Sequence, residues 1–251
     1  MNFFHAVTAA GYAPAPAPGI VTAGLIFRVD AGDPASYPGS GTTWIDTIAG
    51  FNGTLTNGAM YSPNDGGYIS FDDINDIVMF GSSNELTGDN LQDVSFTIWF
   101  RHTSNDTGYM AAIKRLSVNS TLLTLHVNTT GNGQTIPGAV GFMTRNFANT
   151  AHTSIIDTSQ DYRDDEWHSL TAVVDGLTRK LYVDGVLKAT DSQGMQSVSS
   201  NTADFTIGGF ALGGFPLQFY GGKISTSLFY RRVLSDAEIL QNYNAIKVRY
   251  Q

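Results

Sequence analysis

Glutamates are the first residues to test for chemistry in this chain, because paired carboxylates hydrolyse glycosidic bonds. A retaining glycosidase needs two carboxyl groups about 5–5.5 Å apart, one as acid and the other as nucleophile. The only glutamates are Glu85, Glu166 and Glu238, separated by 81 and 72 residues. Such isolated positions do not form a catalytic pair on one strand, and aspartates would have to substitute for them. The sequence therefore predicts that the protein is not an enzyme.

Nucleophilic and zinc chemistry also lack their residues. Cysteine is absent, and no Gly-x-Ser-x-Gly elbow occurs. The histidines lie at least sixteen residues apart, without the short spacing of zinc ligands: they are His5, His102, His126, His152 and His168. His168 follows Trp167 on an expected strand. We interpret it as a structural histidine whose ring bonds to the backbone.

The densest acidic loop covers residues 72–76 (DDIND), between two expected strands. Calcium prefers hard oxygen ligands from loop carboxylates and carbonyls. Asp72, Asp73 and Asp76 are therefore candidate ligands, and calcium is the one cofactor that the sequence suggests. The alternative is a solvated turn, because the residues do not follow the order of the 12-residue calcium loop.

Carbohydrate binding needs an exposed aromatic side chain flanked by hydrogen-bonding groups, whereas most aromatic residues of a sandwich lie in its core. Phe215 and Tyr220 stand out because glycines flank them in the segment 213–222 (GGFPLQFYGG), and such a loop tip buries little. They are candidates for a ligand-binding loop or for a contact between subunits. Four further aromatic residues are weaker candidates: Tyr37, Tyr61, Tyr109 and Phe147.

Short strands must position these residues. Val94–Arg101 alternates with period two and predicts a half-buried strand. Asp175-Gly176 and Asp184-Gly185 each follow an apolar run, and Asp-Gly is the strongest short-range hairpin signal because glycine accepts φ > 0. Other strands are expected at 24–29, 68–72, 77–80, 109–113, 121–127, 140–144 and 153–156. Strands at this spacing, separated by Gly, Asn and Asp turns, predict an all-β sandwich or barrel.

One helix is predicted, and it begins after Ser235. Ser235 and Glu238 form a capping box, in which the serine hydroxyl accepts from the Glu238 backbone and the carboxylate reaches back. An apolar stripe follows at helical spacing: Ile239, Leu240, Tyr243 and Ile246. We expect this helix to close one end of the sandwich.

Three segments resemble a known family. Trp167-His168, the apolar run after it and the sequence LYVDG at 181–185 resemble a laminin-G-like domain of the concanavalin A-like lectin/glucanase group. Residues 205–209 and 222–240 resemble the closing strand and terminal helix of that family. The resemblance implies a two-sheet antiparallel jelly roll whose loops usually bind rather than catalyse. Glucanases of this fold carry Glu-x-Asp-x-Glu on one strand, a motif that this chain lacks.

The resemblance extends to two finer expectations. Many relatives hold calcium, although they often place an acidic residue in the closing strand, where this chain has Ser225 and Thr226. Residues 30–44, 51–55 and 68–72 are similar to the opening of such domains in tailed-bacteriophage virion surface proteins. The resemblance therefore implies a place on a virion surface.

The N-terminal segment differs in composition from the rest. Residues 1–12 are mildly apolar, and Ala13–Gly19 (APAPAPG) is typical of a polyproline-II spacer. We interpret residues 1–19 as an extended docking arm with Phe3, Phe4 and Tyr12 as its anchors, followed by one sandwich domain at 20–251. The arm would join the protein to other virion proteins of a capsid or fibre.

Composition narrows the remaining function classes. Apolar residues make up 42% and charged residues 14% of the 251 positions, so the chain can bury a large core. The net charge is −8, and no basic cluster exceeds two adjacent residues, which argues against nucleic-acid binding. The first residues lack a basic region and a long apolar core, so no signal peptide is expected. No apolar run approaches the ~20 residues that span a bilayer.

These observations together predict a non-enzymatic virion surface protein of a tailed phage. It would decorate the capsid or form a head or tail fibre, assemble in the host cytoplasm, and act as a homo-oligomer such as a trimer. Binding to a cell-surface glycan is a further hypothesis. The alternative is a bacterial carbohydrate-binding module or adhesin, and the third interpretation is a divergent glucan-active enzyme.

Overall fold

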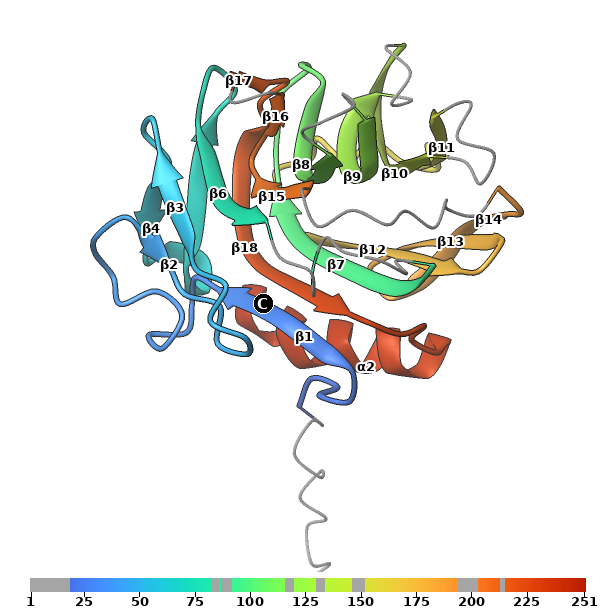
Figure 1. The fold of residues 1–251 in the computed structure, drawn as a ribbon, viewed down its shortest axis with the longest axis horizontal. Helices are drawn as coiled ribbons and strands as arrows, with labels where there is room; N and C mark the ends of the chain where they lie inside the picture. Colours follow the sequence, from blue (N-terminus) through green and yellow to red (C-terminus); the bar gives the residue numbers. More distant parts are fainter. Residues whose placement is uncertain are drawn as a thin grey trace, which may run out of the picture.

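The computed structural model describes residues 19–82, 86, 92–115, 120–129, 134–145, 152–193, 203–212 and 215–251. Within these residues the chain forms two antiparallel sheets of eight strands each, a two-stranded ribbon and one α-helix (Figure 1). The prediction of an all-β sandwich with one short C-terminal helix is confirmed. No described helix is long and apolar enough to cross a membrane.

The first sheet runs in the order β14-β13-β12-β7-β18-β5-β4, and β1 pairs with β18 beside this path. Its central strands, β7 and β12, come from the middle of the chain, whereas β18 comes from the end. The strands are β1 (Leu25–Asp30), β4 (Met60–Ser62), β5 (Tyr68–Asp72), β7 (Asp93–Arg101), β12 (His168–Asp175), β13 (Thr178–Val183), β14 (Val186–Asp191) and β18 (Gly221–Tyr230). A 3-10 turn, η1 (Asn64–Gly66), joins β4 to β5.

The second sheet runs in the order β11-β10-β9-β8-β15-β6-β3-β2. Its strands are β2 (Thr43–Trp44), β3 (Gly53–Thr56), β6 (Ile77–Ser82), β8 (Gly108–Arg115), β9 (Ser120–Thr129), β10 (Thr135–Arg145), β11 (His152–Asp157) and β15 (Ala203–Ile207). The separate ribbon pairs β16 (Phe210–Leu212) with β17 (Phe215–Leu217). The expected hairpins form as well: β12 joins β13 through Gly176 at φ 55°, and β13 joins β14 through Asp184-Gly185, both at positive φ.

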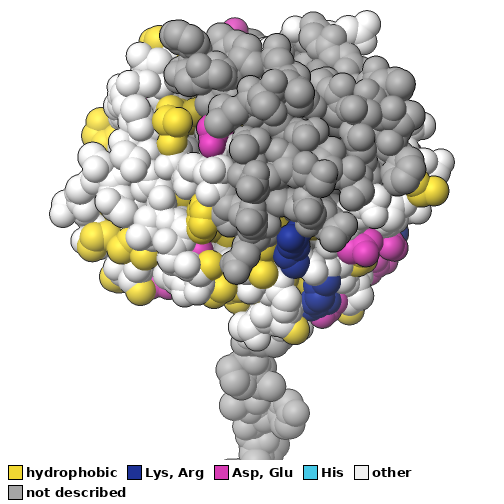
Figure 2. All heavy atoms as spheres, viewed as in Figure 1, with side chains coloured by type: hydrophobic (Ala, Val, Ile, Leu, Met, Phe, Trp, Pro, Cys, Tyr) yellow, Lys and Arg dark blue, Asp and Glu magenta, His cyan; other side chains and the backbone are white. Residues whose placement is uncertain are grey.

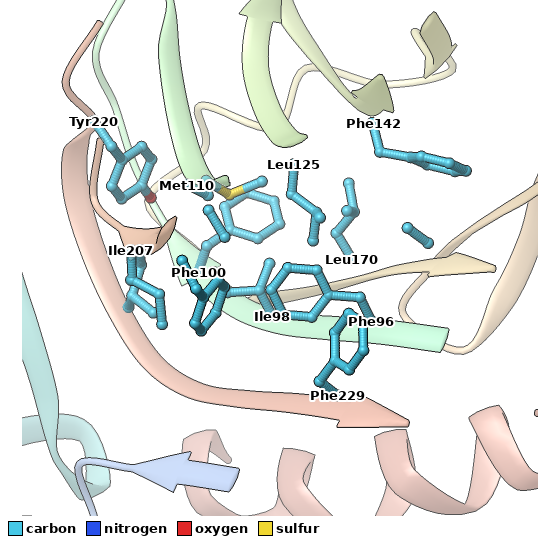
Figure 3. Packing of buried hydrophobic residues seen from close by; sticks show 14 of the residues in the cluster. Phe96, Ile98, Phe100, Met110, Leu125, Phe142, Leu170, Ile207, Tyr220 and Phe229 are labelled. Carbon is cyan, nitrogen blue, oxygen red and sulfur yellow. The ribbon is translucent and has the colours of Figure 1, made fainter. Parts of the chain in front are cut away.

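Aromatic rings fill the space between the two sheets. Phe96 of β7 contacts Phe205 of β15 and Phe229 of β18, with ring centroids 5.7 and 5.3 Å apart. Phe27 meets Phe205 edge to face at 5.1 Å. Figure 3 shows Phe96, Phe229 and their neighbours pointing into this interior. The edge-to-face arrangement is the one that aromatic quadrupoles favour.

Strand β7 is buried on both faces, and the prediction of a half-buried strand is wrong. Phe96, Ile98 and Phe100 belong to the core between the sheets, whereas Trp99 points to the opposite face and is 1% exposed. Helix α2 (Asp236–Lys247) covers that outer face (Figure 1). Both faces of β7 are therefore shielded from solvent, although its sequence alternates between aromatic and polar residues.

Helix α2 begins as predicted. The Ser235 hydroxyl accepts from the Glu238 backbone, and the Glu238 carboxylate accepts from the Ser235 backbone, which completes the capping box. Ile239 and Ile246 pack against the outer face of the first sheet. Leu240 is 45% exposed, so the apolar stripe is narrower than the sequence indicated. A 3-10 turn, η2 (Val248–Tyr250), follows the helix.

The chain enters the domain beside helix α2. The Gln241 side chain donates to the Gly19 carbonyl at 2.8 Å, and the Val21 backbone donates to the Asn242 side chain at 2.8 Å. The Tyr230 hydroxyl donates to the Val21 carbonyl at 2.9 Å. These bonds anchor the start of the sandwich. The predicted arm, with Phe3, Phe4 and Tyr12, lies outside the described residues.

Candidate functional site

A polar cleft of about 330 Å³ opens at one end of the first sheet. Three strands meet there: Asp72 at the end of β5 pairs with Gly221 of β18, and Lys223 of β18 pairs with Arg101 at the end of β7. The loop between β11 and β12 supplies another wall through Asp165. The cleft is lined by residues 71–73, 101–104, 165 and 221–223.

Arg101 is the fixed cation of the cleft. Its Nε and Nη2 donate to the two carboxylate oxygens of Asp165 at 2.7 and 2.8 Å, and its Nη1 donates to Asp65 at 3.0 Å. The hydrogen bond to Asp165 raises the pKa of the guanidinium, so the charge is permanent. Asp165 adopts a left-handed backbone with φ 61°, which is uncommon outside glycine, and the paired guanidinium fixes its carboxylate.

Asp73 lines another part of the cleft and has Asp106 as its neighbour behind the cleft wall. Asp73 and Asp106 share a hydrogen bond, and the Ser104 hydroxyl lies 3.4 Å from an oxygen of each. Burial and the neighbouring Asp106 raise the pKa of Asp73 to about 6. Near neutral pH this pair therefore holds a proton for part of the time, and it can both accept and donate a hydrogen bond.

His102 lines the cleft next to these charges, and Tyr220 packs against it from the core. His102 is 2% exposed, and neither ring nitrogen has a hydrogen-bond partner within the described part of the chain. Burial, followed by the charge of Arg163, lowers the pKa of His102 to about 4, so the ring is neutral at physiological pH. The rings of His102 and Tyr220 lie 6.0 Å apart. His102 therefore adds no charge to the cleft.

Tyr220 is fully buried, so the expectation that this glycine-flanked loop tip buries little is wrong for this residue. Its hydroxyl donates to the Arg101 carbonyl at 3.0 Å, and its ring lies 6.1 Å from that of Phe71. The neighbouring Gly222, at φ 158°, lies where a side chain would strike the Tyr220 ring and the Arg101 backbone. The glycines therefore admit the tyrosine into the core. Phe215 lies on β17, and its side chain is outside the described part.

The three candidate calcium ligands face different neighbours. One oxygen of Asp72 accepts the backbone N–H groups of Ile74, Asn75 and Asp76 at 2.9 to 3.4 Å. Asp73 faces Ser104, and Asp76 is buried with only 3% exposure. Among the described residues, no group of three or more His, Cys, Asp or Glu side chains is placed to hold a metal ion. Calcium binding at Asp72, Asp73 and Asp76 therefore stays a prediction.

His168 is structural, but its partners are side chains and not the backbone. Its Nδ1 lies 2.7 Å from Asp184, and its Nε2 lies 3.2 Å from Asp164. Burial opposes the charged ring, yet the two carboxylates outweigh this effect and raise the pKa of His168. The histidine thereby ties the loop before β12 to the β13–β14 hairpin.

Sequence reasoning missed Arg101, Asp106, Asp165 and Lys223, the charged groups in and around the cleft. Each is an ordinary charged residue at a strand end or in a loop, and no spacing relates them. The acidic run at 164–166 beside Trp167 was the one available signal.

Two antiparallel sheets around one core, with a polar cleft among the loops, define a lectin-like jelly roll. Residues 65–240 match the laminin-G model of the Concanavalin A-like lectin/glucanases superfamily, and the chain belongs to this family. No curated protein matches the chain. The family prediction is therefore confirmed.

Solved structures share this fold at low sequence identity. Trypanosoma rangeli sialidase in complex with sialic acid superposes with a TM-score of 0.65 and 16% identity, over 97% of this chain and 36% of that chain. The receptor-binding domain of botulinum neurotoxin type G superposes with a TM-score of 0.58 and 15% identity, over 88% of this chain and 51% of that chain. The binding domain of Paraclostridial Mosquitocidal Protein 1 superposes with a TM-score of 0.64 and 13% identity, over 89% of this chain and 52% of that chain.

The chain therefore spans between about a third and a half of the length of these solved chains. At such identities the likeness shows the fold alone, since one fold hosts many functions. What the domain does has to be argued from its own cleft.

Proposed function

We propose that this domain binds a saccharide in the loop-end cleft and does not cleave it. The observation that carries this proposal is the mixture of fixed donors and acceptors around one opening. Arg101 and Lys223 can donate hydrogen bonds to a ligand, while Asp73 and Asp165 can accept them. Neighbouring hydroxyl groups of a sugar both donate and accept, so they match such a rim better than a purely anionic or cationic ligand does.

The charge of the surface favours a polar ligand over nucleic acid. The net charge is −8, and Figure 2 shows only a few Lys and Arg side chains on the described part of the face in view. Phosphate backbones require a basic face, which is not seen there. The family match to lectins and glucanases, and the sialic acid complex of a structural neighbour, support a glycan ligand.

Binding without catalysis is proposed because the carboxylates of the cleft are poorly placed for hydrolysis. Asp73 and Asp106 contact each other, whereas a glycosidase holds its two carboxyl groups about 5 Å or more apart across the scissile bond. Glu238 is engaged by Arg232 at the start of α2, and Glu166 is exposed on a loop. Glu85 lies outside the described residues.

Replacement of Arg101 with alanine is expected to weaken saccharide binding at least tenfold, which corresponds to about 1.4 kcal/mol. Charge-assisted hydrogen bonds contribute this much or more, and the change also releases Asp165 from its fixed position. Binding is measured on an array of β-glucan, alginate and bacterial surface polysaccharide fragments.

Arg163→Ala is the matched control, because Arg163 lies on the same loop as Asp165 and does not line the cleft. It is expected to bind like the unchanged protein. Equal binding by Arg101→Ala would contradict the assignment of the cleft. Release of reducing sugar that disappears in Asp73→Asn would show instead that the domain is an enzyme.

The cellular setting proposed for this domain is the surface of a tailed-phage virion. Its support is the similarity of residues 30–44, 51–55 and 68–72 to virion proteins, together with the aromatic arm and Pro-Ala spacer of residues 1–19. In this proposal the arm docks onto a capsid or fibre protein, and the sandwich faces the host glycan. Assembly as a homo-oligomer such as a trimer is part of the same proposal.

Deletion of residues 1–19 is expected to leave a folded sandwich that no longer joins the particle. The domain keeps its own entry contacts, because Val21 bonds to Asn242 and Tyr230. Copurification with virions measures attachment, and circular dichroism checks folding. A truncated protein that still copurifies at the normal copy number would place the attachment elsewhere.

A further inference from the structure

A second, smaller hollow lies beside the end of helix α2. This groove has a volume of about 170 Å³ and is lined by Trp99, Glu166, Trp167, Tyr243, Lys247, Tyr250 and Gln251. The rings of Trp167 and Tyr250 stack at 4.6 Å, and those of Trp99 and Tyr243 stack at 5.6 Å. Aromatic rings therefore form the base of the groove, and the charged side chains of Glu166 and Lys247 lie at its rim.

The groove is small for an independent site. Ligand pockets usually enclose about 300–1,000 Å³. The cleft reaches the lower end of this range and the groove does not. A polar rim above aromatic side chains nevertheless combines the two kinds of group that ligand sites use. The groove is therefore better explained as an extension of a larger site.

One short loop separates the two hollows. Asp165 lines the cleft, while the next two residues, Glu166 and Trp167, line the groove. Side chains connect the hollows as well. Lys223 of the cleft lies 5.2 Å from the centre of the Tyr68 ring, and Tyr68 lies 6.0 Å from Trp167 of the groove.

We infer that the domain binds an extended oligosaccharide, which crosses the Asp165–Glu166 ridge and occupies both hollows. This inference rests on the proposed function of the cleft. Polar groups of the cleft hold the hydroxyl groups of one part of the chain, and the following sugars contact the part of Trp167 that lines the groove. Glu166 and Lys247 bond to hydroxyl groups along the rim.

The test compares short and long ligands on one array. β-Glucan, alginate and bacterial O-polysaccharide fragments are printed at two and at six sugars. The double variant Glu166→Ala/Lys247→Ala removes both rim charges and leaves the stacked rings in place. It is expected to bind hexasaccharides at least tenfold more weakly and disaccharides within twofold of the unchanged protein.

Asp175→Ala/Lys180→Ala is the matched control, since it removes the same pair of charges from the β12–β13 hairpin, outside both hollows. It is expected to change neither affinity. Hexasaccharide binding that depends on Arg101 but not on the rim charges would overturn the extended site and leave the cleft standing. The absence of binding to every fragment would overturn the proposed function, and this inference with it.

Discussion

Replacement of Arg249 with alanine is expected to lower the free energy of unfolding by about 2 to 4 kcal/mol. Its Nη1 and Nη2 donate to the two oxygens of Asp30 at 2.6 and 2.8 Å, and the Asp30 side chain is only 3% exposed. Burial alone would raise the pKa of Asp30, but the guanidinium outweighs it and lowers the pKa. Without Arg249, the buried carboxylate of Asp30 keeps only its weaker hydrogen-bond and charge partners.

The same substitution is expected to loosen the aromatic groove. Arg249 precedes Tyr250, whose ring packs between Trp99 and Trp167 and whose hydroxyl bonds to Ser225. Tryptophan fluorescence during urea unfolding therefore reports both stability and the state of the groove. Charge neutralisation by Asp30→Asn tests the same pair from the other side.

Arg163→Ala serves as the comparison for the ion pair. Arg163 bonds to Asp161, which is more than half exposed, and pairs in solvent contribute little to stability. This variant is expected to unfold like the unchanged protein. A loss of less than 1 kcal/mol in Arg249→Ala would mean that the cost of burying the two charges cancels their attraction.

Lowering the pH from 7 to 4 is expected to cost about 3 kcal/mol through His126 alone. His126 lies on β9 with 0% exposure, and neither ring nitrogen has a partner in the described part of the chain. Burial lowers the pKa of His126 to about 3. The ring of the unfolded chain takes a proton near pH 6.5. Between about pH 6.5 and 3 the unfolded state therefore binds more protons than the folded state, and stability decreases as the pH is lowered.

His126→Leu is expected to remove this part of the acid sensitivity. An apolar side chain of similar size has no proton to gain, and it leaves no unpaired polar group in the core. Urea unfolding at pH 7, 5.5 and 4 measures the change. His102 acts in the same direction, since its pKa is lowered to about 4, and keeps part of the slope in the variant.

His168 provides a control of opposite sign. Its pKa is raised, so its ion pairs stabilise the fold below the unfolded value near 6.5 and lose their effect as the pH rises through the folded pKa. His168→Gln is therefore expected to make acidification more damaging. An unchanged pH slope in His126→Leu would assign acid unfolding to carboxylates instead.

Local features of this fold were predictable because they depend on neighbours in the chain. The hairpin at Asp184-Gly185 needs only two residues that accept positive φ, and both do so here. The capping box of Ser235 and Glu238 spans four residues and forms as expected. Alternation and turn spacing gave the strands and hence the sandwich, and family resemblance gave its class.

The candidate site was decided by tertiary structure. Arg101, Asp165 and Lys223 lie far apart in the sequence, and only the pairing of β7 with β18 and the approach of a distant loop bring them together. The burial of Tyr220 likewise depends on tertiary structure, because Gly222 leaves room for the Tyr220 ring beside the Arg101 backbone at the end of β7. The sequence by itself determined strands, turns and one helix, because backbone preference is local. The relative positions of the charged side chains were decided by the order of the strands in the sheet, which long-range packing sets.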